Sequence, residues 1–255
     1  MSRTIHDIDA QRARWWRYRT GQHLMLEAGE HFALGGLARY ADDPDLRLVF
    51  LPSDPDGDPV PLGSETLDWL KEPRPTPYGG QPPRWGQRTR ATSSALVIYE
   101  QYRDDAGWGQ YLALHRHGGV ELTHGNLAYP VRGTRVFALR HIVGLTWIAA
   151  ALQSEVAERW HVNPPFELTV ALRHANAAVL GSFAEGWREP QAAFGDSAIC
   201  IEDHILLRWE LDELDAEVLA LAVGDRLEQA FGSTLRRHLA NRGDYVGRFD
   251  PRFGF

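Results

Sequence analysis

The stretch ALVIYEQYRDDAGWGQYLALHRHGGVELT, residues 95–123, decides the expected fold. It contains three apolar runs, at 95–102, 110–117 and 120–123, which are typical of half-buried strands. An Asp-Asp-Ala-Gly sequence separates the first two runs, and a Gly-Gly pair separates the last two. Both are turn signals, and the second is short enough for a tight hairpin. The stretch therefore predicts three antiparallel strands in succession.

Outside this stretch, two long helices are predicted at 135–160 and 215–240, because apolar residues recur there at spacings of three and four. Further apolar runs predict strands at 46–51, 166–172, 178–183 and 199–209. The order of elements predicts an α+β fold, a mainly antiparallel sheet with the two longer helices packed on one face.

The proline distribution suggests how the chain is divided. Nine of its 15 prolines lie between Pro52 and Pro83, where loops and at most one short helix, near 67–70, are expected. We therefore expect an N-terminal helical and Pro-rich region at 1–94 and an α+β domain at 95–255.

Composition limits the function classes. The net charge of −7 argues against a general nucleic-acid binder, which is usually basic. Cys200 is the single cysteine and lies in an apolar run, so we expect a buried thiol and no disulfide within the chain. Because no signal peptide or membrane-spanning segment is predicted, we expect a bacterial-type cytoplasmic protein that does not bind membranes.

A histidine-rich pattern lies at the predicted hairpin. Gly109-x5-His115-x-His117-x3-Glu121 resembles the first metal-binding motif of the cupin family. Imidazole and carboxylate groups suit a divalent transition metal, and His124 would be a further ligand. The helix predicted after this pattern departs from the strands of a cupin. We expect a metal-free hairpin, with a metal-dependent enzyme as the alternative.

The length of the hairpin loop determines which side chains meet. A two-residue Gly118-Gly119 turn, which we expect, places Glu121 opposite Arg116 and away from the histidines. A three-residue loop would place Glu121 beside His117 instead.

A second pattern interleaves arginine with aromatic residues near the N-terminus. Such a run can contact phosphates and stack on bases, which makes it a candidate nucleic-acid site. An amphipathic helix with exposed arginines explains the same pattern, so we expect weak nucleic-acid binding at most. The residues of this candidate site are Arg12, Arg14, Trp15, Arg17 and Arg19.

A resemblance covers about residues 108–247. The segments 108–121, 162–172, 224–232 and 242–245 together resemble the C-terminal accessory region of bacterial proteins that carry a Schlafen-type AlbA DNA-binding domain. The AlbA domain itself is not recognisable in this chain. The resemblance therefore implies a β-rich module with two helices and no assigned active site.

These observations favour a non-enzymatic interaction or regulatory module over two alternatives, the metal-dependent enzyme and a nucleic-acid-binding regulator. No cofactor is expected, and the expected partner is a protein. Four aromatic residues, Tyr245, Phe249, Phe253 and Phe255, lie in a tail that cannot form a helix. We expect this tail to dock on its own domain or on a second copy in a homodimer.

Overall fold

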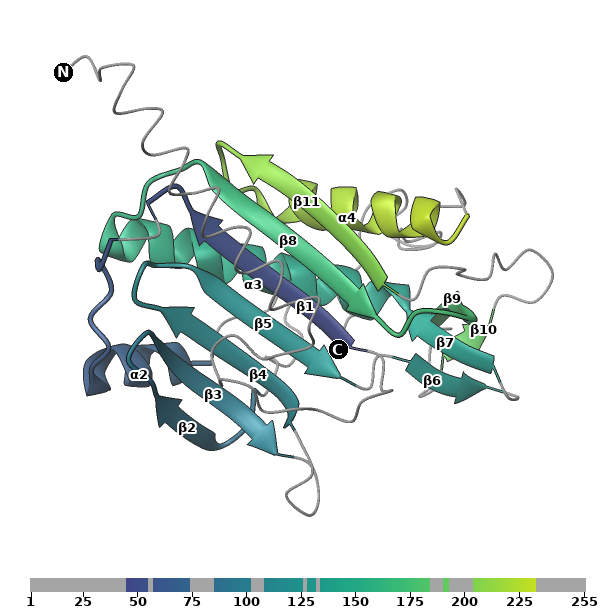
Figure 1. The fold of residues 1–255 in the computed structure, drawn as a ribbon, viewed down its shortest axis with the longest axis horizontal. Coiled ribbons are helices and arrows are strands. Elements are labelled where there is room, and N and C mark those ends of the chain that lie inside the picture. Colours follow the sequence, from purple (N-terminus) through teal and green to yellow (C-terminus); the bar gives the residue numbers. More distant parts are fainter. Residues whose placement is uncertain are drawn as a thin grey trace.

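Figure 1 presents the fold as a computed structural model of residues 1–255. The structure describes residues 45–54, 57–73, 85–101, 108–125, 128–131, 134–183, 190–192 and 204–232. The predicted N-terminal helical segment, the arginine-rich run, Cys200 and the aromatic tail lie outside these residues.

A seven-stranded sheet forms the centre of the described fold (Figure 1). Its strand order is β11-β8-β1-β5-β4-β3-β2, and every neighbouring pair is antiparallel. This confirms the predicted α+β fold with a mainly antiparallel sheet. The strands are β1 (Asp45–Pro52), β2 (Arg88–Ala91), β3 (Ala95–Gln101), β4 (Trp108–His115), β5 (Val120–Gly125), β8 (Phe166–Arg173) and β11 (His204–Leu211).

Strand β1 comes from the region expected to precede the α+β domain, yet it lies between β5 and β8. It forms antiparallel ladders with both neighbours, and Leu48 pairs with Leu122 on one side and Val170 on the other. Strand β2 belongs to the same sheet, at its edge. Two strands that precede residue 95 therefore belong to the same sheet as the strands that follow it.

A second, four-stranded sheet has the order β10-β9-β7-β6. In this sheet β7 and β9 run parallel, whereas the other two pairs are antiparallel. Only β9 of this sheet was predicted from an apolar run. The strands are β6 (Ala128–Val131), β7 (Thr134–Ala138), β9 (Ala178–Phe183) and β10 (Pro190–Ala192).

Three helices are described: α2 (Ser64–Lys71), α3 (Leu139–Trp160) and α4 (Ala216–Ala230). Helix α3 begins after the predicted 135, because the residues before Leu139 form β7. At the start of α4, the Asp215 carboxylate accepts a hydrogen bond from the backbone N–H of Val218, at 3.0 Å. This is an N-cap, which satisfies one of the free N–H groups of the first turn.

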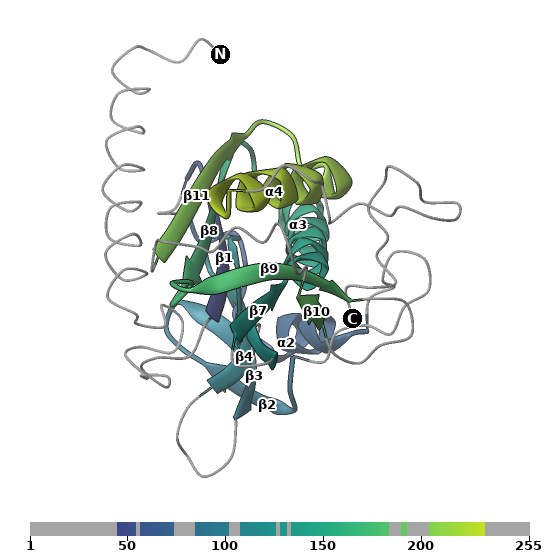
Figure 2. The ribbon, with the colours of Figure 1, turned by 90° about the vertical axis from the view of Figure 1, so that its right-hand side faces the viewer.

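Helices α3 and α4 lie on the same side of the large sheet (Figure 2). The strands bury alternate apolar residues against them, as Leu46, Leu48 and Phe50 show in β1. Helix α3 also meets the small sheet at β9 and α4 along its length, so its N-terminal half is buried on nearly all sides. This explains why α3 is apolar well beyond one stripe.

Candidate functional site

The histidine-rich pattern forms the tip of the β4–β5 hairpin, and its loop differs from the prediction. Leu114 pairs with Val120, and the His115 N–H donates to the Gly119 carbonyl oxygen at 2.9 Å. The loop is therefore three residues long, from Arg116 to Gly118, and the predicted two-residue turn is wrong.

The conformation of Gly118 explains the longer loop. Its N–H donates back to the His115 carbonyl oxygen at 2.9 Å, and its φ is 85°. A turn followed by a glycine in the left-handed region is the usual form of a three-residue hairpin. A Cβ on Gly118 would also lie 2.4 Å from Cγ2 of Val162, so a larger residue does not fit there.

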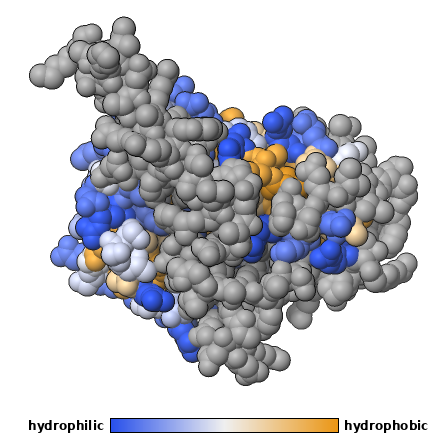
Figure 3. Space-filling model, in the orientation of Figure 1, coloured by the Kyte–Doolittle hydropathy of each residue, from blue (hydrophilic) through white to orange (hydrophobic). Residues whose placement is uncertain are grey.

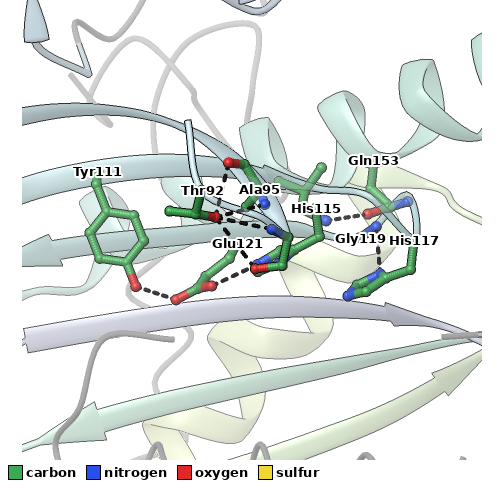
Figure 4. A network of polar contacts seen from close by, with 10 residues as sticks. Thr92, Ala95, Tyr111, His115, His117, Gly119, Glu121 and Gln153 are labelled. Carbon is green, nitrogen blue, oxygen red and sulfur yellow. Dashed lines mark hydrogen bonds and ion pairs between the residues drawn. The ribbon is translucent and has the colours of Figure 1, made fainter. Parts of the chain in front are cut away.

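The three-residue loop brings Glu121 to the same face as His115. Oε2 of Glu121 accepts a hydrogen bond from Nε2 of His115 at 2.8 Å, and Oε1 accepts one from the Tyr111 hydroxyl (Figure 4). All three residues are fully buried. Each carboxylate oxygen of Glu121 thus accepts one hydrogen bond, and the three residues link β4 to β5.

The predicted contact between Arg116 and Glu121 is wrong for the same reason. Arg116 lies in the loop and points outward, where its Nη1 is 3.8 Å from Oδ2 of Asp58. Its Nε donates to the Ser93 carbonyl oxygen at 3.3 Å. Arg116 therefore ties the hairpin tip to neighbouring loops.

The environment of Tyr111 keeps its hydroxyl protonated. Burial raises its pKa well above 10, and the negative charge of Glu121 raises it further, while the positive charge of Arg47 opposes the shift. The phenol therefore remains a hydrogen-bond donor to the carboxylate at neutral pH.

His117 packs on His115, the other histidine of the pattern. The His115 and His117 rings are stacked, with an interplanar angle of 1° and centroids 5.0 Å apart. The Gly119 N–H donates to Nδ1 of His117 at 3.1 Å. Burial, and secondly the charge of His115, lowers the pKa of His117 well below 6.5. His117 is therefore a neutral ring that accepts a backbone hydrogen bond.

Gln153 on α3 holds the hairpin tip from the helix side (Figure 4). Its Nε2 donates to the Gly118 carbonyl oxygen and its Oε1 accepts from the Val120 N–H, both at 2.9 Å. A Cβ on Gly119 would lie 2.3 Å from the Phe50 carbonyl oxygen, so β1 also packs closely here. Gln153 of α3, Phe50 of β1 and Val162 therefore all lie close against the tip.

His124 does not join this group. Its ring lies on the helix side of the sheet, in an edge-on contact with His141 of α3, with centroids 4.9 Å apart. Burial, and secondly the charge of His124, lowers the pKa of His141 to about 3. Within the described residues, no three His, Cys, Asp or Glu side chains are arranged to hold a metal ion.

Other polar residues of this face were not expected from the sequence. Tyr111 pairs with Thr123, which in turn pairs with Arg47 of β1, so the three form one row across the sheet. Arg47 is fully buried. The alternation Leu46-Arg47-Leu48 was the available signal, because it places Arg47 on the face opposite to the two leucines.

The sequence also showed no sign of a surface group of one exposed arginine and two partly buried tryptophans, which we call the Trp–Arg cluster: Trp69, Arg159 and Trp160. The two indole rings meet edge-on, with centroids 4.8 Å apart. The guanidinium carbon of Arg159 lies 5.4 Å from the centroid of Trp69 and 5.2 Å from that of Trp160. The tryptophans are partly buried and Arg159 is exposed, at the place where α2 meets the end of α3.

Comparison with known proteins finds no matching family, curated protein or solved structure. Among the described helices, none is both long and apolar enough to cross a membrane.

Proposed function

We propose that this protein is a non-enzymatic module that binds another protein through the Trp–Arg cluster. The observation that carries this proposal is the arrangement of Arg159 over two tryptophan rings at the surface. Tryptophan and arginine are the residues most enriched among those that dominate binding energy at protein interfaces.

The geometry of the cluster suits recognition. Cation–π contacts with both rings restrict Arg159, so less side-chain freedom is lost when a partner binds. The guanidinium offers several N–H donors in a fixed plane, which match a carboxylate. A protein surface with an aspartate or glutamate beside an apolar patch fits this cluster.

The polar group at the hairpin supports the same interpretation. Tyr111, His115 and Glu121 are fully buried and bind one another. Such a group stabilises the packing of β4 and β5, and removing one member leaves a buried polar atom without its partner. It does not offer a reactive atom to a substrate in this arrangement.

The proposal is tested by capturing partners with the full chain as bait. Wild type is compared with Arg159→Ala and with Arg116→Ala, a matched change of another arginine at the surface. We expect a partner that wild type and Arg116→Ala retain and Arg159→Ala loses, followed by titration of that partner in pure form. Identical capture by all three baits contradicts the proposal.

The metal-dependent enzyme remains the alternative, with His115, His117, Glu121 and His124 as its ligands. Elemental analysis of protein purified without chelator and without a histidine tag distinguishes the two. We expect well under one equivalent of any transition metal. A stoichiometric metal that is lost in His115→Ala favours the enzyme and contradicts the proposed module.

Nucleic-acid binding, which the N-terminal arginine run suggests, also stays a prediction. Its test is an anisotropy titration across salt concentrations, because phosphate contacts make binding steeply salt-dependent. We expect weak binding. Tight binding abolished in Arg14→Ala and Arg17→Ala favours the regulator instead.

A further inference from the structure

The two edges of the seven-stranded sheet differ. Strand β2 ends the sheet on one side and has four residues, all exposed, including Arg88 and Arg90. Short, charged edge strands of this kind resist pairing with other chains. Strand β11 ends the sheet on the other side and has eight residues, with no proline, glycine or lysine among them.

The side chains of β11 are also more apolar. Leu206, Leu207, Trp209 and Leu211 are each partly exposed. Figure 3, in the orientation of Figure 1, shows apolar surface near the start of β11, with hydrophilic surface above it. Among the described strands, β8 is the one neighbour of β11. A long apolar edge strand with one neighbour is suited to strand addition.

The sequence of β11 is complementary to itself in the antiparallel direction. Suppose that Trp209 pairs with Trp209 of a second copy. Arg208 of each copy then lies opposite Glu210 of the other, and Leu207 of each lies opposite Leu211 of the other. Opposite charges in directly paired positions stabilise a sheet, and like charges destabilise it. This register therefore gives favourable pairs over residues 207–211, whereas Leu206 lies opposite Asp212, just beyond the end of the strand.

The charges within one chain point the same way. Glu210 is exposed and pairs across β11 and β8 with Glu167, so two carboxylates occupy directly opposed positions. An arginine on the outer side of Glu210 would be a favourable neighbour for its carboxylate. In the proposed register, Arg208 of a second copy occupies that side.

We propose that two copies of this chain associate through β11, antiparallel about a two-fold axis at Trp209, to form one continuous sheet. The occupant of the edge is a second copy because the charge pattern of β11 complements itself. The Trp–Arg cluster takes no part in this contact, so the proposal is independent of the proposed function.

The test is a charge exchange, measured by analytical ultracentrifugation of the full chain. Glu210→Arg places Arg208 opposite an arginine, and Arg208→Glu places Glu210 opposite a glutamate. We expect each variant alone to dimerise at least about tenfold more weakly than wild type. An equimolar mixture of the two restores opposite charges at both positions, so we expect the mixture to dimerise again.

Arg90→Glu, a charge reversal on the other edge strand, is the matched control and should dimerise like wild type. Circular dichroism and thermal unfolding check that each variant is folded. If Arg208→Glu does not fold, Glu210→Arg alone decides, because its side chain is exposed. A monomeric wild type, or a dimer that persists unchanged in folded Glu210→Arg, overturns the proposal.

Discussion

Both faces of the large sheet bury residues in the central strands, but the face toward the helices is largely apolar, whereas the other mixes polar residues with apolar ones such as Val49 and Ala113. On the face toward α3 and α4, the central strands bury apolar residues such as Leu48 and Phe50. On the opposite face, β1, β4 and β5 bury Arg47, Tyr111 and Glu121 with no exposed surface. Burial alone therefore does not identify an apolar core.

This difference determines how each face responds to change. The apolar face is stabilised in proportion to the area removed from water and to its packing, neither of which depends strongly on pH. The polar face gains little net energy from each hydrogen bond, but loses much when a partner is removed or changes its charge. Substitutions on each face should show this difference, whereas acid should act on both faces through their buried histidines.

The largest effect should come from the apolar face. Phe50→Ala removes a fully buried ring and should lower the free energy of unfolding by about 3–5 kcal/mol. Urea denaturation measures this, and the loss should be the same at pH 7 and pH 8. Phe50→Leu is the control and should lose less, because it preserves more of the volume. A small loss in Phe50→Ala would show that this face is loosely packed.

Acid should destabilise the protein through its buried histidines, one on each side of the sheet. The folded pKa values of His117 and His141 lie below 6.5, so their contributions are present above that pH and are lost as pH falls. With a folded pKa of about 3, His141 should account for about 2 kcal/mol of the loss between pH 7 and pH 5.

Urea denaturation at pH 7 and pH 5 measures this loss in wild type, His117→Phe and His141→Phe. Each variant should lose less stability than wild type over that interval. An unchanged pH dependence in both variants would mean that other groups cause the acid sensitivity.

A smaller effect is expected from the polar face in Tyr111→Phe. The change removes the hydroxyl that donates to Glu121 and should lower the free energy of unfolding by about 1–2 kcal/mol. The folded pKa of Tyr111 is raised, so its contribution is present below pH 10 and is lost as pH rises above it.

Guanidinium denaturation of wild type and Tyr111→Phe at neutral and at alkaline pH measures both the stability lost in the variant and the stability lost as pH rises. Wild type should lose more stability above pH 10 than Tyr111→Phe does. Equal alkaline losses would show that Tyr111 ionises as readily in the folded chain as in the unfolded chain.

The smallest effect should come from the surface pair of Arg116 and Asp58. These side chains are 40% and 66% exposed, with 3.8 Å between Nη1 and Oδ2. Asp58→Asn should change stability by less than about 0.5 kcal/mol, because exposed ion pairs are screened by solvent. A larger loss in thermal unfolding would mean that Arg116 holds the hairpin loop through this pair.

The sequence predicted most strands and helices but misplaced the side chains of one loop. Apolar runs at 46–51, 166–172 and 178–183 became β1, β8 and β9 with small changes at their ends. The short strands β2 and β10 were not predicted, since few apolar residues mark them. At the hairpin, one additional loop residue reversed the face of Glu121 and thus its partner.

The candidate site was predicted in part. His115, His117 and Glu121 were identified from their residue types, because imidazole and carboxylate groups at short spacing stand out in any sequence. Their partners Tyr111 and Gln153 were not, since one lies further along β4 and the other on α3, 33 residues from the Val120 N–H that it binds. The Trp–Arg cluster was missed for the same reason, as α2 and the end of α3 meet only in the fold.

The sequence by itself determined the class of fold, because the alternation of apolar residues sets which backbone conformation buries them. Tertiary structure alone decided that β1 lies at the centre of the sheet, and that Glu121 meets His115 and Tyr111. The local sequence pattern shows only how often buried residues recur along the chain. Which strands become neighbours, and in what register, depends on the packing of distant segments and on the conformation of single residues such as Gly118.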